Sequence, residues 1–188
     1  MRSDALILAA GGSTRFGPAP KLLADLGGRP VLEHILDAAC AVDELDRILV
    51  VLGADAELVR RNVRFGRAET VVCGNWSDGV SASLRCGLSA LEPSSRVIVL
   101  LGDDPTLTAS VIRRFLRAPD GARATYRGRP GHPVVLGAAQ LARIAELNGD
   151  VGARGLIVGG QLIECGDLAS GADVDTPADL EELRRTRP

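Results

Sequence analysis

The stretch LILAAGGSTRFGPAPKLL, from Leu6 to Leu23, is an apolar run that breaks into a glycine-rich loop. The run itself, residues 5–10, is typical of a β-strand that is buried on both faces of a parallel sheet. Three later runs have the same character and are bounded by polar or glycine residues: RILVVL (47–52), ETVVC (69–73) and RVIVLL (96–101). The sequence therefore predicts several central strands, of which the first leads directly into the loop.

Segments with the periodicity of amphipathic helices lie between and after these runs. Their ranges are 30–41, 54–63, 81–91, 109–116, 138–147 and 177–186. Because strands that alternate with helices form right-handed βαβ units, the sequence predicts an α/β fold: a doubly wound, mostly parallel sheet with helices on both faces. Residues 122–136 interrupt this rhythm, since two short strand candidates flank a turn of glycine and proline. We expect a small antiparallel excursion there.

The overall composition is that of an ordinary globular protein. The chain has 188 residues, a length at which one core hides roughly 70% of the unfolded surface, and we expect a single domain over residues 1–188. The net charge is −2 with both signs interspersed, which offers no basic field to nucleic acid or to an anionic membrane. The four cysteines stand far apart without a CxxC pair, so neither a disulfide nor a metal site is indicated. No apolar stretch suits a signal peptide or a bilayer span, and we expect a cytoplasmic protein.

The loop after the first strand carries the residue types that bind phosphate. Gly11 and Gly12 let the backbone approach a ligand, and amides in such a turn can form an anion-binding concavity. Arg15 and Lys21 add positive charge. The spacing fits neither the P-loop, G-x-x-x-x-G-K-[ST], nor the dinucleotide pattern G-x-G-x-x-G. From these residues alone, the loop is either an anion cradle at the carboxyl edge of the sheet or a βα turn whose glycines and charges are structural.

Six segments, taken in order, resemble the motifs of one family. They are LAAGGSTRFGPAPKLL (8–23), NWSDGVSASLRCGL (75–88), LLGDDP (100–105), GRPGHPVVL (128–136), NGDVGAR (148–154) and DVDTPADL (173–180). This ordered set is similar to the signature of the MobA-like nucleotidyltransferases and covers nearly the whole chain. The double alanine of the opening, the GHP motif and the GD-x-GAR motif are most similar to molybdenum cofactor cytidylyltransferases. The resemblance implies the nucleotide-diphospho-sugar transferase-like form of the predicted sheet.

The resemblance also implies an activity, the Mg²⁺-dependent transfer of CMP from CTP to the phosphate of molybdopterin cofactor with release of pyrophosphate. The implied partners are CTP or another NTP, molybdopterin, and a molybdenum enzyme that receives the cofactor, with no nucleic acid and no membrane. Two alternatives stay open: the same fold using GTP or another phosphorylated acceptor, and a cofactor-binding chaperone with little catalysis. Some relatives of the family carry an oxidoreductase name from pigment degradation, but the sequence has neither a dinucleotide fingerprint nor a redox cysteine pair.

The resemblance assigns the chemistry to a few charged side chains. Arg15, Lys21 and Asp103 are the expected catalytic residues: the cations neutralise the triphosphate and the leaving pyrophosphate, and Asp103 holds Mg²⁺. Asp175 is the second expected metal ligand. Without the family, GDDP reads as an ordinary turn and Asp175 as a helix cap. Asp104 departs from the family pattern, which has Gln or Met there, so it either tightens metal binding or faces solvent.

The nucleotide is expected along the glycine loop and at the start of the helix 81–91. The expected nucleotide-binding residues are Leu8, Ala9, Ala10, Gly11, Gly12, Ser13, Arg15, Lys21, Asn75, Gly79, Ser81, Ser83 and Asp103. Ser81 and Ser83 suit a helix N-cap equally well. Trp76 packs either over the nucleotide or in the core.

The acceptor substrate is expected to meet His132, Asp150 and Arg154. His132 follows a basic turn, Arg127 and Arg129, that suits an anionic pterin phosphate. Asp150 and Arg154 either contact the hydrogen-bonding edge of the pterin or order their own loop.

Overall fold

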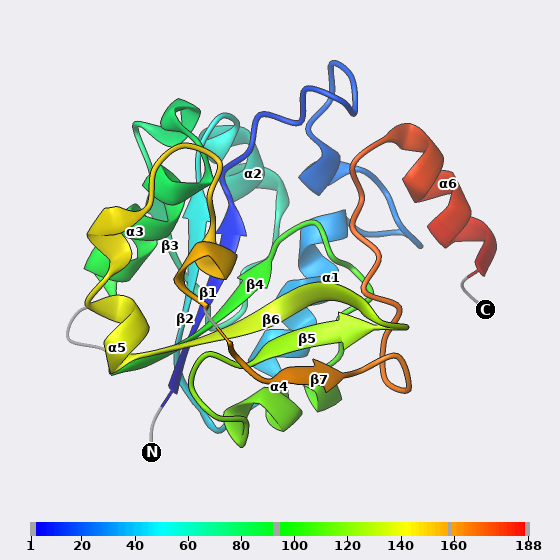
Figure 1. The fold of residues 1–188 in the computed structure, drawn as a ribbon. Coiled ribbons are helices and arrows are strands. Elements are labelled where there is room, and N and C mark those ends of the chain that lie inside the picture. The colour runs from blue at the N-terminus through cyan, green and yellow to red at the C-terminus, as the bar shows by residue number, and fades with distance from the viewer. Residues whose placement is uncertain (1–2, 92–94, 158, 187–188) are drawn as a thin grey trace.

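The computed structural model of the chain describes residues 3–91, 95–157 and 159–186, and they are built around one seven-stranded sheet with the order β3-β2-β1-β4-β6-β5-β7 (Figure 1). The strands are β1 (Ser3–Ala9), β2 (Leu45–Leu52), β3 (Glu69–Val72), β4 (Arg96–Leu101), β5 (Arg123–Tyr126), β6 (Arg129–Gly137) and β7 (Leu162–Glu164). Only β6 runs antiparallel to its neighbours, β4 and β5; the other pairs are parallel. The predicted fold class is confirmed.

Helices cover both faces of this sheet. The helices are α1 (Val31–Cys40), α2 (Ala56–Asn62), α3 (Val80–Ala90), α4 (Ala109–Leu116), α5 (Ala138–Leu141) and α6 (Pro177–Thr186), with short 3₁₀ turns η1 (Lys21–Leu23), η2 (Trp76–Asp78), η3 (Ile144–Glu146) and η4 (Ala153–Leu156). α1, α2 and α4 pack into one core on one face, whereas α3 and η4 pack into the core on the other face. Crossover helices on both sides are what a parallel sheet requires.

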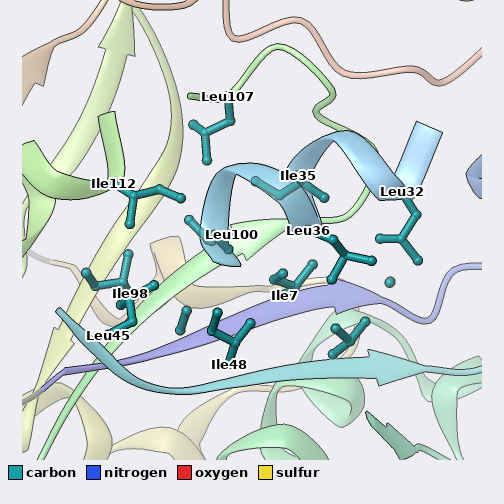
Figure 2. Close-up of a cluster of buried hydrophobic side chains, with 14 of the residues drawn as sticks. Ile7, Leu32, Ile35, Leu36, Leu45, Ile48, Ile98, Leu100, Leu107 and Ile112 are labelled. Atoms are coloured by element: carbon teal, nitrogen blue, oxygen red, sulfur yellow. The ribbon is translucent and has the colours of Figure 1, made fainter. Parts of the chain in front are cut away.

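The core beneath α1 is built from side chains that alternate along the central strands. Figure 2 shows Ile7, Ile48 and Ile98 of the strands against Ile35 and Leu36 of α1. Each of these side chains is almost completely buried. Burying one such side chain stabilises the fold by roughly 1.5–3 kcal/mol, so this cluster fixes α1 and the strands as one unit.

The opposite face of the sheet lies very close to α3. Leu6 of β1 points to this side, because successive strand residues face opposite ways. Gly87 stands where α3 crosses the sheet, and a Cβ atom added there would lie 2.5 Å from Leu6 Cδ1 and 2.6 Å from Val51 Cγ2. A glycine at this crossing therefore lets α3 pack closely against the sheet.

Two regions after β4 test what local pattern predicted. The antiparallel excursion is confirmed as the β5–β6 hairpin, whose turn has Arg127 at φ 51° and Gly128 at φ 77°. The helix predicted over 138–147 is only α5 followed by η3, because the amides of Arg143 and Glu146 bond three residues back rather than four. β7 was not predicted.

A small satellite core attaches α6 to the rest of the molecule. Leu180 and Leu183 of α6 pack with Leu26, Val31 and Val174. Within the described residues, none of the helices is both long enough and apolar enough to cross a bilayer.

Candidate active site

A cavity of about 700 Å³ lies at the carboxyl ends of β1 and β4. Its walls come from the loop after β1, the start of α3, the end of β4, the β5–β6 hairpin, the segment 150–154 and the segment 173–175. This is the edge where an open α/β sheet binds its ligands. Segments far apart in the sequence therefore meet around one space.

The glycine loop forms one wall of the cavity. Ser13 folds it back: its hydroxyl accepts a hydrogen bond from the Lys21 amide at 3.2 Å, and its carbonyl accepts one from Phe16. Across the described part of the chain, the amides of Gly11 and Gly12 have no acceptor. The loop thus presents backbone donors and positive side chains to the cavity, as an anion cradle does.

Four charged side chains at one end of the cavity, which we call the carboxylate end, interlock. Lys21 Nζ lies 2.5 Å from Asp103 Oδ2 and 2.9 Å from Asp175 Oδ1. Arg15 Nη2 lies 3.0 Å from Asp175 Oδ2. Burial acts to lower the pKa of Lys21, but Asp103 and Asp175 together raise it above its ordinary value. The ammonium is therefore charged, and it bridges two carboxylates.

The backbone around Asp175 explains how it reaches Asp103. The Val174 amide donates to the Asp103 carbonyl at 2.8 Å, which lays the segment 173–175 along the end of β4. Thr176 and Asp179 cap α6 themselves: Asp179 Oδ2 accepts from the Thr176 amide at 2.7 Å and from the Asp175 amide at 3.1 Å. Since the cap is made by these groups, the Asp175 carboxylate is left to face Lys21.

The other two aspartates of this region have different surroundings. Asp104 is 3% exposed, lies outside the lining, and accepts from the Thr106 hydroxyl at 2.7 Å, so it neither faces solvent nor reaches the cavity. Burial raises its pKa to about 6. Asp173 lines the cavity, but burial and the neighbouring carboxylates raise its pKa to about 8. Asp103 and Asp175 are therefore the aspartates that both line the cavity and contact the Lys21 ammonium.

These two carboxylates fit a divalent cation that is shared with a ligand. Both point at one position, now filled by the Lys21 ammonium. The part of the chain that the structure describes has no cluster of three or more His, Cys, Asp or Glu side chains suited to a metal. Mg²⁺ is commonly held by only one or two carboxylates plus phosphates and waters, which matches this donor set.

The start of α3 and the turn before it form the cavity wall next to the glycine loop. Trp76, Gly79 and Ser83 line the cavity. Gly79 has φ 101°, and a Cβ atom there would lie 2.4 Å from the backbone of Gly149. Ser81, also expected at the nucleotide, is fully buried outside the lining, with its amide on the Gly149 carbonyl.

Asn75 is the other expected nucleotide residue that lies outside the lining. Its amide group donates to Asp78 at 3.3 Å and its carbonyl oxygen accepts from the Cys73 thiol at 3.3 Å. The remaining expected nucleotide-binding residues line the cavity: Leu8, Ala9, Ala10, Gly11, Gly12, Ser13, Arg15, Lys21, Gly79, Ser83 and Asp103.

Another part of the cavity lining, which we call the arginine end, contains Arg123, His132 and Arg154. Arg123 stands opposite Val134 in the β5–β6 ladder, and Val134 stands opposite Val99 of β4. This register puts Arg123 two strands away from β4, on the face that α3 covers. Burial and the two arginines lower the pKa of His132 to about 4, so its imidazole is neutral at pH 7.

The sequence identified most of the arginine end but not Arg123. His132, Asp150 and Arg154 line the cavity as expected, while Arg127 and Arg129 of the hairpin tip do not. Arg123 is flanked in the sequence by Ala122 and Ala124, so nothing local marks it as a site residue. The signal that could have found it is its pairing with the strand that carries the GHP motif.

A parallel sheet with a glycine loop after β1 and paired carboxylates beyond β4 is the arrangement of a nucleotide-binding transferase. Residues 5–164 match the family described as MobA-like NTP transferase domain. The chain belongs to the MobA-like nucleotidyltransferase family, so the expected family is confirmed.

The chain is also similar to individual proteins in sequence and in structure. The chain is 31% identical over 193 residues to nicotine blue oxidoreductase of Paenarthrobacter nicotinovorans, covering 95% of this chain and 94% of the relative. It is similar to the crystal structure of Rv0371c from Mycobacterium tuberculosis H37Rv, with a TM-score of 0.85, 27% identity and 98% of each chain covered. The same mycobacterial protein in complex with manganese gives a TM-score of 0.82, with 25% identity and all of both chains covered.

Proposed function

We propose that the protein is a metal-dependent cytidylyltransferase that moves CMP from CTP to the phosphate of molybdopterin and releases pyrophosphate. The observation that carries the transfer chemistry is the carboxylate end, where Lys21 and Arg15 interlock with Asp103 and Asp175 beside the glycine loop. Membership of a nucleotidyltransferase family supports the use of an NTP. The choice of cytidine and molybdopterin is supported by the double alanine, the GHP motif and the GD-x-GAR motif, because residues of all three line the cavity.

The reaction needs positioning and charge neutralisation more than covalent help from the protein. An oxygen of the acceptor phosphate forms a bond to the α-phosphorus of CTP, and the bond from that phosphorus to the bridging oxygen of the β-phosphate breaks. The electron pair of the broken bond leaves with pyrophosphate. In the proposed site the amides of Gly11 and Gly12 hold the triphosphate, and Arg15 and Lys21 stabilise the charge that develops on pyrophosphate.

We propose Mg²⁺ as the metal, held by Asp103 and Asp175 together with phosphate oxygens. When bound, it would supply positive charge that neutralises the phosphates. The structure of Rv0371c in complex with manganese supports the use of a divalent ion. Lys21 now spans the two carboxylates, so it must turn from them to the triphosphate when metal and nucleotide enter.

The name of the Paenarthrobacter relative brings in a second candidate, an oxidoreductase. Cys73, just after β3, and Cys86, within α3, are neighbouring free thiols, so they are the pair to consider for redox chemistry. Burial, with Cys73 as neighbour, raises the pKa of Cys86 to about 11, so the reactive thiolate is scarce at neutral pH. The transferase proposal therefore predicts that reduced nicotinamide is not oxidised in the presence of any acceptor.

Thermal unfolding with nucleotides tests the proposal directly. CTP with Mg²⁺ should raise Tm more than GTP with Mg²⁺, because the base would contact the wall formed by the loop after β1 and the start of α3. Equal shifts would overturn the choice of cytidine, and no shift with either nucleotide would overturn the proposal as a whole. Pyrophosphate release that requires both CTP and molybdopterin separates the enzyme from a cofactor-binding chaperone.

A further inference from the structure

Among the described residues, no carboxylate forms an ion pair with either of the two cations at the arginine end. Across residues 3–91, 95–157 and 159–186, neither Arg123 nor Arg154 forms an ion pair. Many other arginines of the chain face a carboxylate: Arg29 with Asp37, Arg47 with Glu69, Arg64 with Glu33, Arg96 with Asp120 and Arg114 with Asp167. Two guanidiniums against one lining carboxylate there, that of Asp150, therefore leave a local excess of positive charge.

The Arg123 side chain is already oriented for a ligand. Its Nε donates to the Gly131 carbonyl at 3.1 Å, which anchors the base of the guanidinium to the neighbouring strand. Within the described chain, its two terminal nitrogens have no acceptor. A guanidinium held in this way presents a planar fork that binds two oxygens of one anion.

The two guanidiniums and His132 are close enough to affect one another. Burial, and then the charge of Arg154, lower the pKa of Arg123. The same two arginines, together with burial, keep the His132 imidazole neutral. The arginine end therefore combines two positive charges with a neutral hydrogen-bonding ring, a set that favours an anion over a cation.

We propose that Arg123 and Arg154 bind the phosphate monoester of the acceptor, the substrate that receives the nucleotide. This inference rests on the proposed function and adds the residues that select the acceptor. A phosphate dianion matches two guanidiniums in charge, whereas a carboxylate brings a single negative charge. Arg123 lies on β5, two strands beyond β4, and lines the same cavity as Asp103, so an anion held there and the nucleotide would share one space.

Inorganic phosphate is the probe that tests this subsite. The protein is first saturated with Mg²⁺ and a CTP analogue that has a methylene bridge between the α- and β-phosphorus, and phosphate is then titrated by calorimetry. Wild type should bind phosphate saturably and acetate much more weakly. Arg123→Gln and Arg154→Gln should each weaken phosphate binding by about 10- to 100-fold, the loss of a charge-assisted fork. Affinity for the nucleotide analogue should stay unchanged in both variants.

The matched control is Arg129→Gln, which removes an arginine of the same hairpin that lies outside the lining. It should bind phosphate as wild type does. Arg154→Gln keeps the test valid if Arg123→Gln fails to fold. The Arg154 side chain is exposed and makes no hydrogen bond within the described residues, so its loss should not disturb the fold. The proposal is overturned if wild type holds the analogue but no phosphate, if it binds acetate as tightly as phosphate, or if the two variants bind phosphate normally. Failure of the analogue to bind wild type overturns the proposed function instead, and phosphate titration without nucleotide then still compares Arg123→Gln with Arg129→Gln.

Discussion

The two ends of the cavity differ in whether their cations are paired with carboxylates. At the carboxylate end, Lys21 and Arg15 are both engaged by Asp103 or Asp175, so the end is close to neutral. At the arginine end, Arg123 and Arg154 have no carboxylate partner among the described residues. A neutral end can be loaded only by ligands of both signs together, a cation for the carboxylates and an anion for the ammonium. The positive end attracts an anion by itself.

The contrast implies that ligands bind cooperatively at the carboxylate end and that an anion binds independently at the arginine end. A metal ion that enters the carboxylate end alone must displace a charged lysine, and a triphosphate alone must compete with two carboxylates. When the two enter together, the metal ion replaces Lys21 as the partner of the carboxylates. The triphosphate replaces the carboxylates as the partner of Lys21. Metal and nucleotide should therefore strengthen each other's binding, whereas an anion at the arginine end needs neither.

The largest expected effect comes from breaking the carboxylate end. Asp103→Asn removes one of the two carboxylates that would hold the metal, and pyrophosphate release should fall by about 100- to 1000-fold. Asp43→Asn, an exposed aspartate far from the cavity, is the control and should retain full activity. Normal turnover of Asp103→Asn would show that Asp103 does not hold the metal.

Gly79→Ala should disturb the arginine end and spare the carboxylate end. Gly79 has φ 101° and ψ −179°, a conformation that costs a side chain roughly 1–3 kcal/mol, and the new methyl group would overlap the backbone of Gly149. The segment that carries Arg154 should shift, so phosphate binding falls while Mn²⁺ binding in the absence of nucleotide is retained. Denaturant unfolding measures the stability loss, with Gly74→Ala, which has open space around it, as the control. A variant that keeps full phosphate affinity would show that the two segments are not coupled.

Lys21→Met should sharpen the contrast by freeing the two carboxylates from their internal cation. In the absence of nucleotide, Mn²⁺ should bind about tenfold more tightly, since a neighbouring positive charge is gone. Affinity for CTP with Mg²⁺ should fall, because the triphosphate loses a cation. Calorimetric titration measures both, with exposed Arg61→Gln as the control. Unchanged Mn²⁺ affinity would mean that Lys21 does not compete with the metal.

The smallest expected effect is a pH dependence that has opposite signs at the two ends. The pKa of His132 is about 4 in the fold against an ordinary 6.5, so the unfolded chain binds the proton first as the pH falls. The stability that the neutral imidazole contributes is complete above pH 6.5 and is lost on acidification towards pH 4. Lys21, whose pKa is raised, contributes stability that is lost only as the pH rises through that raised value.

Denaturant unfolding of wild type and His132→Gln between pH 7 and pH 4 measures this difference. As the pH falls, the free energy of unfolding of wild type should decrease more steeply than that of the variant. The difference in slope corresponds to the uptake of at most one proton on unfolding. The variant keeps the backbone carbonyl of residue 132 that accepts from the Tyr126 hydroxyl at 2.6 Å. Parallel curves would contradict the depressed pKa.

Local pattern predicted the strands other than β7, the loop edge and the excursion, because buried parallel strands leave continuous apolar runs that need no tertiary context. It could not decide which polar side chains enter the cavity. Asp103 and Asp104 are neighbours in one turn, yet only Asp103 lines the cavity. The Asp104 carboxylate is buried instead, where it accepts hydrogen bonds from the amide and the hydroxyl of Thr106. The basic tip at Arg127 and Arg129 turns away, while Arg123 enters through the register of the hairpin. Register and loop packing are long-range properties, so such choices need the fold.

The attachment of Asp175 makes part of the site separable from the sheet. Asp175 precedes α6, which is held by the satellite core of Leu26, Val31, Val174, Leu180 and Leu183 and not by the two main cores. A local opening of α6 would withdraw one carboxylate while every strand stays paired. Hydrogen exchange in α6 should therefore report how often the site is incomplete. A substitution in this distant helix, such as Leu183→Ala, would act on catalysis as an intermittent loss of Asp175, with the population of the closed helix setting the fraction of competent molecules.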